Sequence, residues 1–339
     1  MTTEKLHRPT LKDVAVLAGV DASLVSRVVN KDSGFSIPDS TRNRVLAAVA
    51  AVGYRPSAAA RSLRTQKLAT LGLIVPDLTN PVYAPIVAGV QLAATSAGYA
   101  LILASDTEAP SRVGTHTIVR MLAEDRVDGL LVASGTVTSD LLDMLADVGK
   151  PVVLVNRGLP NIPSITVDDE AGARLATRYL IRRGHQRIMH LAGPLGVDTT
   201  DRRLAGYHSA VHEAPSVIAG RTVHALGWGA AEGYAAGRDL LGSLSQGTAV
   251  FVANVTLAIG FYRAAHEAGL AIPGDISVIA LHDYDLAAMI VPSLTTVAMP
   301  LKELGEAAVK QLLGILDSAP PEDLMVRTKP VLVERNSVS

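Results

Sequence analysis

The sequence predicts an α/β protein with a small helical domain at the N-terminus and a larger body of two lobes. The chain of 339 residues is longer than one ordinary compact domain. Its first part carries three short helical patterns, and the remainder alternates apolar strand patterns with helical ones, as parallel sheets do. Hydrophobic residues make up 48% and charged residues 19%, which excludes a globally disordered chain.

Composition and charge narrow the function classes. There is no cysteine, which excludes disulfides, thiolate nucleophiles and cysteine metal sites. The sequence has neither an apolar run of the roughly 18 residues that span a bilayer nor an apolar signal region, so we expect a cytoplasmic protein without a membrane partner. Residues 1–67 hold four Lys and seven Arg against four Asp and one Glu, a net charge of +6 that leaves −7 for the rest. A basic head on an acidic body indicates a polyanionic partner, although a solvated basic face has the same pattern.

The first two helical patterns predict a helix-turn-helix unit. The first begins after Thr10, a good N-cap, and ends before Gly19, which can adopt the left-handed conformation of a helix C-cap. Asp21 then caps a second helix over residues 22–29. Two short helices joined by a turn that contains glycine form this unit. The side chains expected to face inward are Leu11, Val14, Ala15, Ala18, Val25 and Val28, and those expected to face outward are Ser23, Ser26 and Arg27.

A third helix is predicted over residues 41–52, with Gly53 as its stop. Three helices with so small a core form a domain that can present its second helix to the major groove of DNA. An ordinary helical hairpin is the alternative. The expected buried face of the third helix comprises Val45, Leu46, Val49 and Val52.

Short motifs follow one another along the chain. They are TLKDVA from Thr10, AGV from Ala18, VSRVVN from Val25, TR from Thr41, GYRP from Gly53, ARSLR from Ala60, LGLIVPD from Leu71, NP from Asn80, RVDG from Arg126, GH from Gly184 and RLAGY from Arg203. Together they resemble the lactose/galactose-repressor family of bacterial transcription regulators. The resemblance implies a body like that of periplasmic binding proteins, a homodimer, double-stranded operator DNA as a partner, and a small-molecule effector.

Residues 57–64 have helix-forming composition, with Ser57 as a cap after Pro56. Eight residues are too few for a stable isolated helix, so this hinge segment should order only when another surface packs against it. The resemblance supplies two such surfaces, the same segment of a second subunit and the DNA minor groove, with Leu63 as the apolar wedge between bases. The alternative is a flexible linker whose Leu63 packs on its own domain.

The body is predicted to contain two successive parallel sheets of similar size, hence two lobes with a cleft beyond the carboxyl ends of their strands. The resemblance adds that the chain crosses between lobes more than once. It also assigns a helix over residues 302–316 and a terminal strand near residues 331–334 to the first lobe. The other strands are expected at 71–75, 100–104, 129–133, 151–155, 187–191, 249–252 and 277–281, and the helices at 86–97, 138–148, 171–183, 202–212, 230–241 and 256–268. We place the domain boundaries at residues 1–56, 57–67 and 68–339.

The sequence contains no catalytic motif. It lacks a Gly-x-Ser-x-Gly elbow, a His-Glu-x-x-His motif and a phosphate-binding loop, so we expect neither an enzyme nor a cofactor. The nine histidines show no metal-ligand spacing, and His185 and His190 are interpreted as structural.

The resemblance assigns six residues to the effector: Tyr83, Asn156, Arg203, Trp228, Asn254 and His282. Trp228 and Tyr83 offer flat faces for a sugar ring or a base, and Arg203 offers a fork of donors for hydroxyls or an anion. Ordinary core burial is the alternative for the two aromatic residues.

Three positions depart from the family pattern, because Asn156, Val255 and His282 stand where acids are usual. A histidine can donate a hydrogen bond, and near pH 6.5 it can carry a positive charge. The loss of acids beside a retained Arg203 favours a neutral or anionic effector: a sugar derivative, a nucleoside-like compound or an unmodified neutral sugar.

The resemblance also assigns the DNA contacts. Arg27 is the best candidate for a contact to guanine, because its guanidinium can bond both acceptors of that base. Phosphate contacts fix the register of the protein on DNA. Base-reading positions are Ala22, Ser23 and Arg27, phosphate contacts are Thr10, Ser26 and Asn30, and the minor-groove wedge is Leu63.

The sequence therefore predicts a transcriptional regulator, with repression as its expected mode, that binds a pseudo-palindromic operator as a dimer under control of a small molecule. A solute-binding receptor with the same two-lobed body is the main alternative, and an enzyme of sugar or nucleotide metabolism is a distant third. The receptor would need export, and the enzyme would need a catalytic set. No leucine heptads follow Arg335, so a helix-bundle tetramer is not expected.

Overall fold

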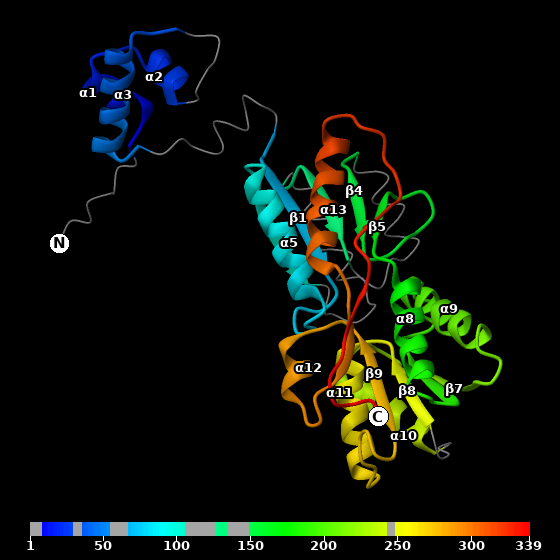
Figure 1. Ribbon diagram of the computed structural model, residues 1–339. Helices are drawn as coiled ribbons and strands as arrows, with labels where there is room; N and C mark the ends of the chain where they lie inside the picture. The colour runs from blue at the N-terminus through cyan, green and yellow to red at the C-terminus, as the bar shows by residue number, and fades with distance from the viewer. Residues whose placement is uncertain (1–8, 30–35, 55–66, 106–125, 134–148, 243–247) are drawn as a thin grey trace. The chain divides into compact units, whose positions relative to one another are not determined.

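The structure, a computed structural model, describes residues 9–29, 36–54, 67–105, 126–133, 149–242 and 248–339 (Figure 1). The chain divides into two compact units, Met1–Leu68 and Ala69–Ser339. The predicted hinge segment, the helix expected at 138–148, and the proposed DNA contacts Asn30 and Leu63 lie outside the described residues. Within the described ranges, no helix has both the length and the apolar character required to cross a membrane.

The N-terminal unit contains α1 Leu11–Ala18, α2 Ala22–Val29 and α3 Asp39–Val52. Thr10 caps α1: its hydroxyl accepts from the backbone N–H of Asp13, whose carboxylate accepts from the backbone N–H of Thr10 at 2.7 Å. Gly19 ends α1 at a φ of 62°, which glycine adopts without steric cost. The first two helices have the predicted bounds, and the prediction of a helix-turn-helix unit is confirmed.

The third helix differs from its prediction. It begins earlier, at Asp39, and its buried residues are Val45 and Ala48. Leu46, which was predicted to be buried, is 47% exposed. Successive helical residues are rotated by about 100° about the helix axis. The face that Val45 buries therefore includes the residues three and four positions away, whereas Leu46, the next residue, lies about 100° from it. The prediction for Leu46 was wrong because its apolar character was given more weight than helical periodicity.

The body contains two sheets, each at the centre of a lobe (Figure 1). In the first lobe the strand order is β11-β5-β4-β3-β1-β2, and all described pairs are parallel. Helices α5 and α13 pack against this sheet. The elements are β1 Thr70–Val75, α5 Tyr83–Ser96, β2 Ala100–Ser105, β3 Gly129–Val132, β4 Val152–Val155, β5 Ser164–Thr166, α13 Leu301–Leu316 and β11 Leu324–Met325.

Helices α5 and α13 approach each other closely enough for their backbones to touch. A Cβ atom on Gly89 would lie 2.0 Å from the carbonyl oxygen of Lys302, and one on Gly305 would lie 2.2 Å from that of Ile86. Only glycine fits at both positions. This contact fixes α5, whose first residue, Tyr83, is one of the predicted effector contacts.

In the second lobe the strand order is β12-β10-β9-β8-β6-β7, with every pair parallel except β10 and β12. Helices α8 and α9 cover one face of this sheet, and α10 and α11 cover the other. The elements are α8 Asp169–Arg182, β6 Arg187–Ala192, α9 Asp198–His212, β7 Ile218–His224, α10 Ala230–Leu241, β8 Thr248–Val252, α11 Val255–Glu267, β9 Ser277–Leu281, α12 Asp285–Met289, β10 Thr295–Ala298 and β12 Val331–Val333.

The predicted two-lobed α/β fold is confirmed, but the terminal strand was assigned to the wrong lobe. Strand β12 pairs antiparallel with β10, so it completes the second sheet, whereas β11 adds to the edge of the first. The chain passes from one lobe to the other after β5, β10 and β11. Strands β5, β7, β10 and β11 were not predicted, because a strand at or near a sheet edge needs no continuous apolar run.

Candidate functional site

Helix α2 carries polar residues on the surface of the N-terminal unit. Ser23 and Arg27 are exposed and Ala22 and Ser26 are half-buried, while the opposite face supplies buried valines to the core. The Asp21 carboxylate accepts a hydrogen bond from the backbone N–H of Ser23 at 2.7 Å, and hydrogen bonds from the hydroxyl and backbone of Ser23 lower the pKa of Asp21. The helix therefore begins with a capped end and an outward-facing polar surface, as an element that enters a DNA groove requires.

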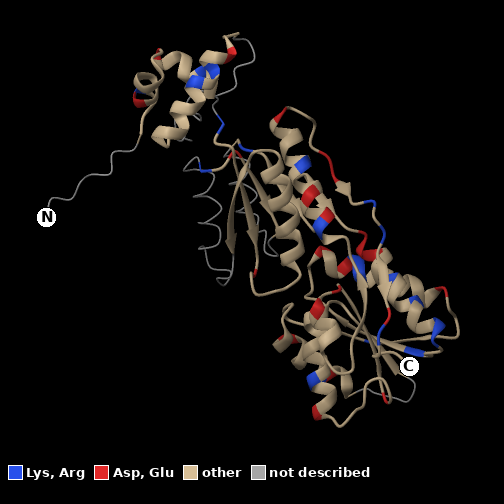
Figure 2. Ribbon diagram, turned by 60° about the vertical axis from the view of Figure 1, so that its left-hand side comes forward, with Lys and Arg blue, Asp and Glu red and all other residues tan. Residues whose placement is uncertain are grey.

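The remaining predicted DNA contact that the structure describes is Thr10. It is exposed at the start of α1, and its hydroxyl donates to an Asp13 carboxylate oxygen at 2.8 Å. Figure 2 shows basic and acidic residues on the helices of this unit, whose core consists of small apolar side chains. The assignment of these residues to bases and phosphates stays a prediction.

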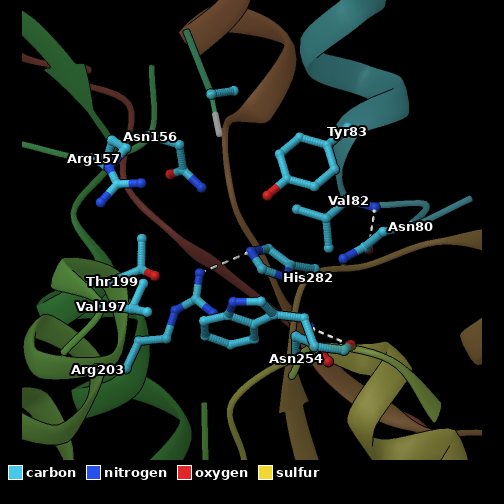
Figure 3. Close-up of a pocket in the computed structure, with 12 residues that line it drawn as sticks. Asn80, Val82, Tyr83, Asn156, Arg157, Val197, Thr199, Arg203, Asn254 and His282 are labelled. Carbon is cyan, nitrogen blue, oxygen red and sulfur yellow. Dashed lines mark hydrogen bonds between the residues drawn. The ribbon is translucent and has the colours of Figure 1, made fainter. Parts of the chain in front are cut away.

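The body holds a pocket between its two lobes (Figure 3). Asn156 follows β4, Trp228 follows β7, Asn254 follows β8 and His282 follows β9. Because parallel strands end at the same edge of a sheet, residues far apart in sequence meet there. All six residues that were assigned to the effector from the sequence line this one pocket: Tyr83, Asn156, Arg203, Trp228, Asn254 and His282.

Half of the described lining was not predicted. Arg157 could have been found, since it directly follows Asn156 at the end of β4. It is buried, and this burial lowers the pKa of its guanidinium. Asn80 could also have been found, since it begins the NP motif. The other missed residues lie at the start of α5 and α9 and at the end of β3, where no sequence signal distinguishes them. The missed residues are Asn80, Val82, Ala133, Arg157, Val197 and Thr199.

Arg203 is held in place from several sides. Its Nε donates to an Asp169 carboxylate oxygen at 2.8 Å, and its Nη1 donates to the carbonyl oxygen of Ala253 at 3.0 Å. Its guanidinium lies over the ring of Trp228, 5.2 Å from the centroid. Asp169 is fully buried, as the first residue of α8. The fork of donors predicted for Arg203 is therefore partly used inside the protein, where it fixes the orientation of the side chain.

His282 is neutral in this site. It is fully buried at a φ of 72°, and burial together with the charge of Arg203 lowers its pKa well below the usual 6.5. Arg203 Nη2 lies 3.4 Å from His282 Nε2. The expectation of a positive charge on His282 near pH 6.5 is wrong, because a cationic imidazole would be buried beside a guanidinium.

A second arginine joins the pocket wall to the second lobe. Arg202 donates to Asp169 at 2.7 Å, to Asp198 through a short contact, and to the carbonyl oxygen of Asn156 at 3.4 Å. Asp198 also accepts from the backbone N–H of Gly158 at 2.8 Å. The segment after β4, which carries Asn156 and Arg157, is thereby fastened to helix α9.

Asn254 has a structural role as well as a place in the pocket. Its side-chain oxygen Oδ1 accepts from the backbone N–H of Leu257 at 2.7 Å and so caps α11. Its side-chain nitrogen Nδ2 donates to the backbone carbonyl oxygen of Trp228 at 3.3 Å. Val255, which was interpreted as a changed pocket residue, is fully buried in the core of the second lobe and is not among the described lining residues. The replacement of an acid at that position therefore bears on packing.

Tyr83 and Asn156 complete the polar wall. Burial raises the pKa of Tyr83 to about 12, so its hydroxyl stays protonated and can donate. Asn156 is buried at a φ of 64°, and its side-chain oxygen has no hydrogen-bond partner among the described residues. A buried polar atom of this kind requires a partner from a ligand or from water.

His190 lies in the core of the second lobe, away from the pocket. It is fully buried, its Nδ1 is 2.9 Å from the carbonyl oxygen of Phe251, and its ring stacks on that of Phe251 with centroids 4.6 Å apart. Burial lowers the pKa of His190 to about 3, so it is neutral. No group of three potential metal ligands occurs in the part of the chain that the structure describes.

Two family models match the chain. Residues 10–57 match the bacterial regulatory proteins of the lacI family, and residues 177–338 match a periplasmic binding protein-like domain. These two regions correspond to the three-helix unit and to most of the second lobe together with the C-terminal elements.

Full-length relatives have the same two parts. The HTH-type transcriptional repressor PurR of Photobacterium profundum is 36% identical, over 97% of this chain and 98% of its own. The ribose operon repressor of Escherichia coli (strain K12) is 33% identical over 97% of this chain and 99% of its own. Among solved structures, the lac repressor dimer bound to operator and the anti-inducer ONPF is 29% identical, covers 98% of this chain and 99% of that chain, and gives a TM-score of 0.82.

Proposed function

Because this chain belongs to the LacI family of bacterial regulatory proteins, we propose that the pocket between its lobes binds a small-molecule effector that controls repression. The chain is a DNA-binding transcriptional regulator that acts on an operator as a homodimer. A transport receptor is no longer a competing assignment, since the similarity to repressors extends over 97% of the chain and includes the three-helix unit. The similar proteins are regulators, and no enzyme family is indicated.

One observation carries the effector proposal. Six polar and aromatic side chains from four strand ends and two helices meet in a single pocket. That pocket encloses about 40 Å³, which is room for a few water molecules and far less than a ligand site of several hundred Å³. Entry of a sugar-sized effector therefore requires the lobes to move apart, and this movement would couple the pocket to DNA binding.

On the DNA side, helix α2 is proposed to enter the major groove. Arg27 is its most discriminating residue, since Ala22 and Ser23 are small. We keep the boundaries 1–56 for the DNA-binding domain, 57–67 for the hinge and 68–339 for the body. Because its operator lies on bacterial DNA, the protein is proposed to act in the cytoplasm. The full set of proposed contacts is Thr10, Ala22, Ser23, Ser26, Arg27, Asn30 and Leu63.

The experiment combines operator selection with an effector screen. Rounds of selection from a random duplex pool should enrich a pseudo-palindrome, and affinity for it should fall steeply with salt. Sugars, phosphorylated sugars and nucleosides are then tested for a change in the fluorescence of Trp228, the single tryptophan of the chain and a residue of the pocket.

A compound that changes this fluorescence should also change operator affinity, and DNA should change the affinity for the compound by the same factor. Trp228→Ala, followed by thermal shift instead of fluorescence, should remove the response while operator binding without effector persists. A compound that alters operator affinity equally in the Trp228→Ala variant would place the effector elsewhere.

A further inference from the structure

We infer that the effector carries an anionic oxygen group, a carboxylate or a phosphate, which accepts a hydrogen bond from His282 beside Arg203. This inference rests on the proposed function of the pocket and concerns the chemistry of its ligand. The described lining includes two guanidinium groups, Arg157 and Arg203, and no carboxylate. The pocket wall is thus rich in donors, and the ligand must be correspondingly rich in acceptors.

The proton on His282 can be assigned from its neighbour. A guanidinium has donors and no acceptor, so Arg203 Nη2 can approach His282 Nε2 at 3.4 Å only if Nε2 accepts. The neutral imidazole then carries its proton on Nδ1. Nδ1 is buried, and it has no hydrogen-bond partner among the described residues. His282, which lines the pocket, therefore carries a buried N–H donor that no described residue satisfies.

The surrounding contacts fix which ring nitrogen of His282 accepts and which one donates. Asp169 and the carbonyl oxygen of Ala253 bind two other nitrogens of Arg203, and the ring of Trp228 covers its face. Arg203 cannot withdraw from His282 without giving up these bonds in a buried site. A network of satisfied buried hydrogen bonds fixes one arrangement, so the donor on His282 is a constant feature of the pocket.

An anionic oxygen suits this donor better than a hydroxyl does. A hydroxyl that accepts from His282 must still place its own proton, whereas a carboxylate or phosphate oxygen only accepts. Charge also favours an anion: the described cluster of Arg157, Arg202 and Arg203 with Asp169 and Asp198 sums to one positive charge. Hydrogen bonds between a cationic guanidinium and an anionic oxygen are the strong ones.

The test uses compounds in matched pairs on the full chain. D-Gluconate is compared with D-sorbitol, D-galacturonate with D-galactose, D-ribose 5-phosphate with D-ribose, and D-glucose 6-phosphate with D-glucose, each at constant ionic strength. Ligands of the native state raise its melting temperature. The largest increase should come from an anionic compound and should exceed that of its neutral partner. The carboxylate and phosphate pairs show which of the two groups the pocket accepts.

Two variants of nearly equal shape report on the donor itself. His282→Asn keeps an N–H close to the position of Nδ1, and His282→Asp places an acceptor there; both residue types tolerate the positive φ of this site. The dissociation constant of the best compound should rise about tenfold or more in His282→Asp and stay within about threefold in His282→Asn. Melting temperatures without ligand and operator affinities of both variants serve as controls for folding.

Several outcomes would overturn the inference. They are a neutral compound as the strongest ligand, no advantage of any anionic compound over its partner, or equal binding by wild type and His282→Asp. Trp228→Ala separates this failure from failure of the proposed function. If a ligand no longer binds Trp228→Ala but binds His282→Asp as it binds the wild type, only the inference of an anionic group is refuted. If both variants bind the ligand as the wild type does, the pocket is not the effector site.

Discussion

The N-terminal unit and the second lobe use polar side chains in opposite ways. In the N-terminal unit the core consists of small apolar residues, and the polar residues of α2 lie at or near its surface. In the second lobe the polar residues beside the pocket are buried and bound to one another, with Asp169 between Arg202 and Arg203. The first arrangement suits the proposed recognition of a large charged partner, and the second suits the proposed selection of a small one.

The difference teaches where substitutions should act independently. Exposed side chains that do not share a partner contribute to free energies that add within a few tenths of a kcal/mol. Buried side chains in one hydrogen-bond network depend on each other, because the loss of one leaves another charge uncompensated. Substitutions in the buried network of the second lobe should therefore affect stability and effector response together, whereas those of exposed residues on α2 should affect DNA binding alone.

The largest expected effect is that of Asp169→Ala. Removal of this fully buried carboxylate takes the carboxylate partner from Arg203 and one of two from Arg202, and should lower the free energy of unfolding by about 3–5 kcal/mol. Urea unfolding of the full chain, followed by the fluorescence of Trp228, measures it. Asp239→Ala removes the surface partner of Arg221 and should cost less than about 1 kcal/mol. Equal costs for the two variants would show that burial does not set the cost of losing a carboxylate partner.

The next effect is a pH dependence of the stability of the body. The pKa of His190 is about 3 in the folded protein against 6.5 in the unfolded chain, so the unfolded state binds more protons below pH 6.5. The stability that neutral His190 contributes is complete above pH 6.5 and is lost as the pH falls toward 3. At pH 5 the loss amounts to about 2 kcal/mol.

His190→Asn removes this titration and keeps a donor for the carbonyl oxygen of Phe251. Its free energy of unfolding should therefore fall less than that of the wild type between pH 7 and pH 5. Both proteins retain the contribution of His282, so the comparison isolates one residue. Identical pH profiles would mean that His190 titrates normally.

On α2, Arg27→Ala should cost about 1–3 kcal/mol of operator affinity and relax discrimination at one base pair in each half-site. The side chain is exposed, so the melting temperature of the body should not change. Binding to a set of operators with single substitutions measures both quantities. If affinity fell equally on every sequence, Arg27 would be a phosphate contact.

The smallest expected effect is that of Thr10→Ala, which removes the cap of α1 at a cost of about 1 kcal/mol. Amide hydrogen exchange in α1 should become about fivefold faster. Thr10 is also a proposed phosphate contact, so Thr10→Ala should weaken operator binding as well. In the double variant with Arg27→Ala, the losses of operator affinity of the two single variants should add within about 0.5 kcal/mol. A larger coupling energy would contradict the independence that the surface of the N-terminal unit implies.

Much of the fold could be predicted because its elements have strong local signals. Helix α10 has the predicted bounds, and the apolar runs located β1, β3 and β4 to within one residue at each end. The misplaced β12 shows the limit. The apolar run Val331–Val333 indicated the strand itself, but the lobe to which it belongs is decided by its partner, β10, an earlier part of the chain.

Half of the described pocket lining was predicted, but the electrostatics of the pocket were not. The six assigned residues came from resemblance to a family, and the structure brings them together. The role of Asp169 beside the pocket was not predicted, because an acidic residue at the start of a helix usually lies in solvent and interacts with the helix dipole. Only the packing of α8 against α9 reveals that two arginines bind its buried carboxylate. His282 is neutral because burial, together with the charge of Arg203, lowers its pKa.

The three passages of the chain between the lobes limit what the body can communicate. They run side by side: the backbone N–H of Val326 donates a hydrogen bond to the backbone carbonyl oxygen of Thr166, and the side chain of Met299 lies against Gly172. Three crossing segments that lie side by side can serve as one hinge. We therefore expect effectors of different shapes to reach the DNA through the same bending of the two lobes.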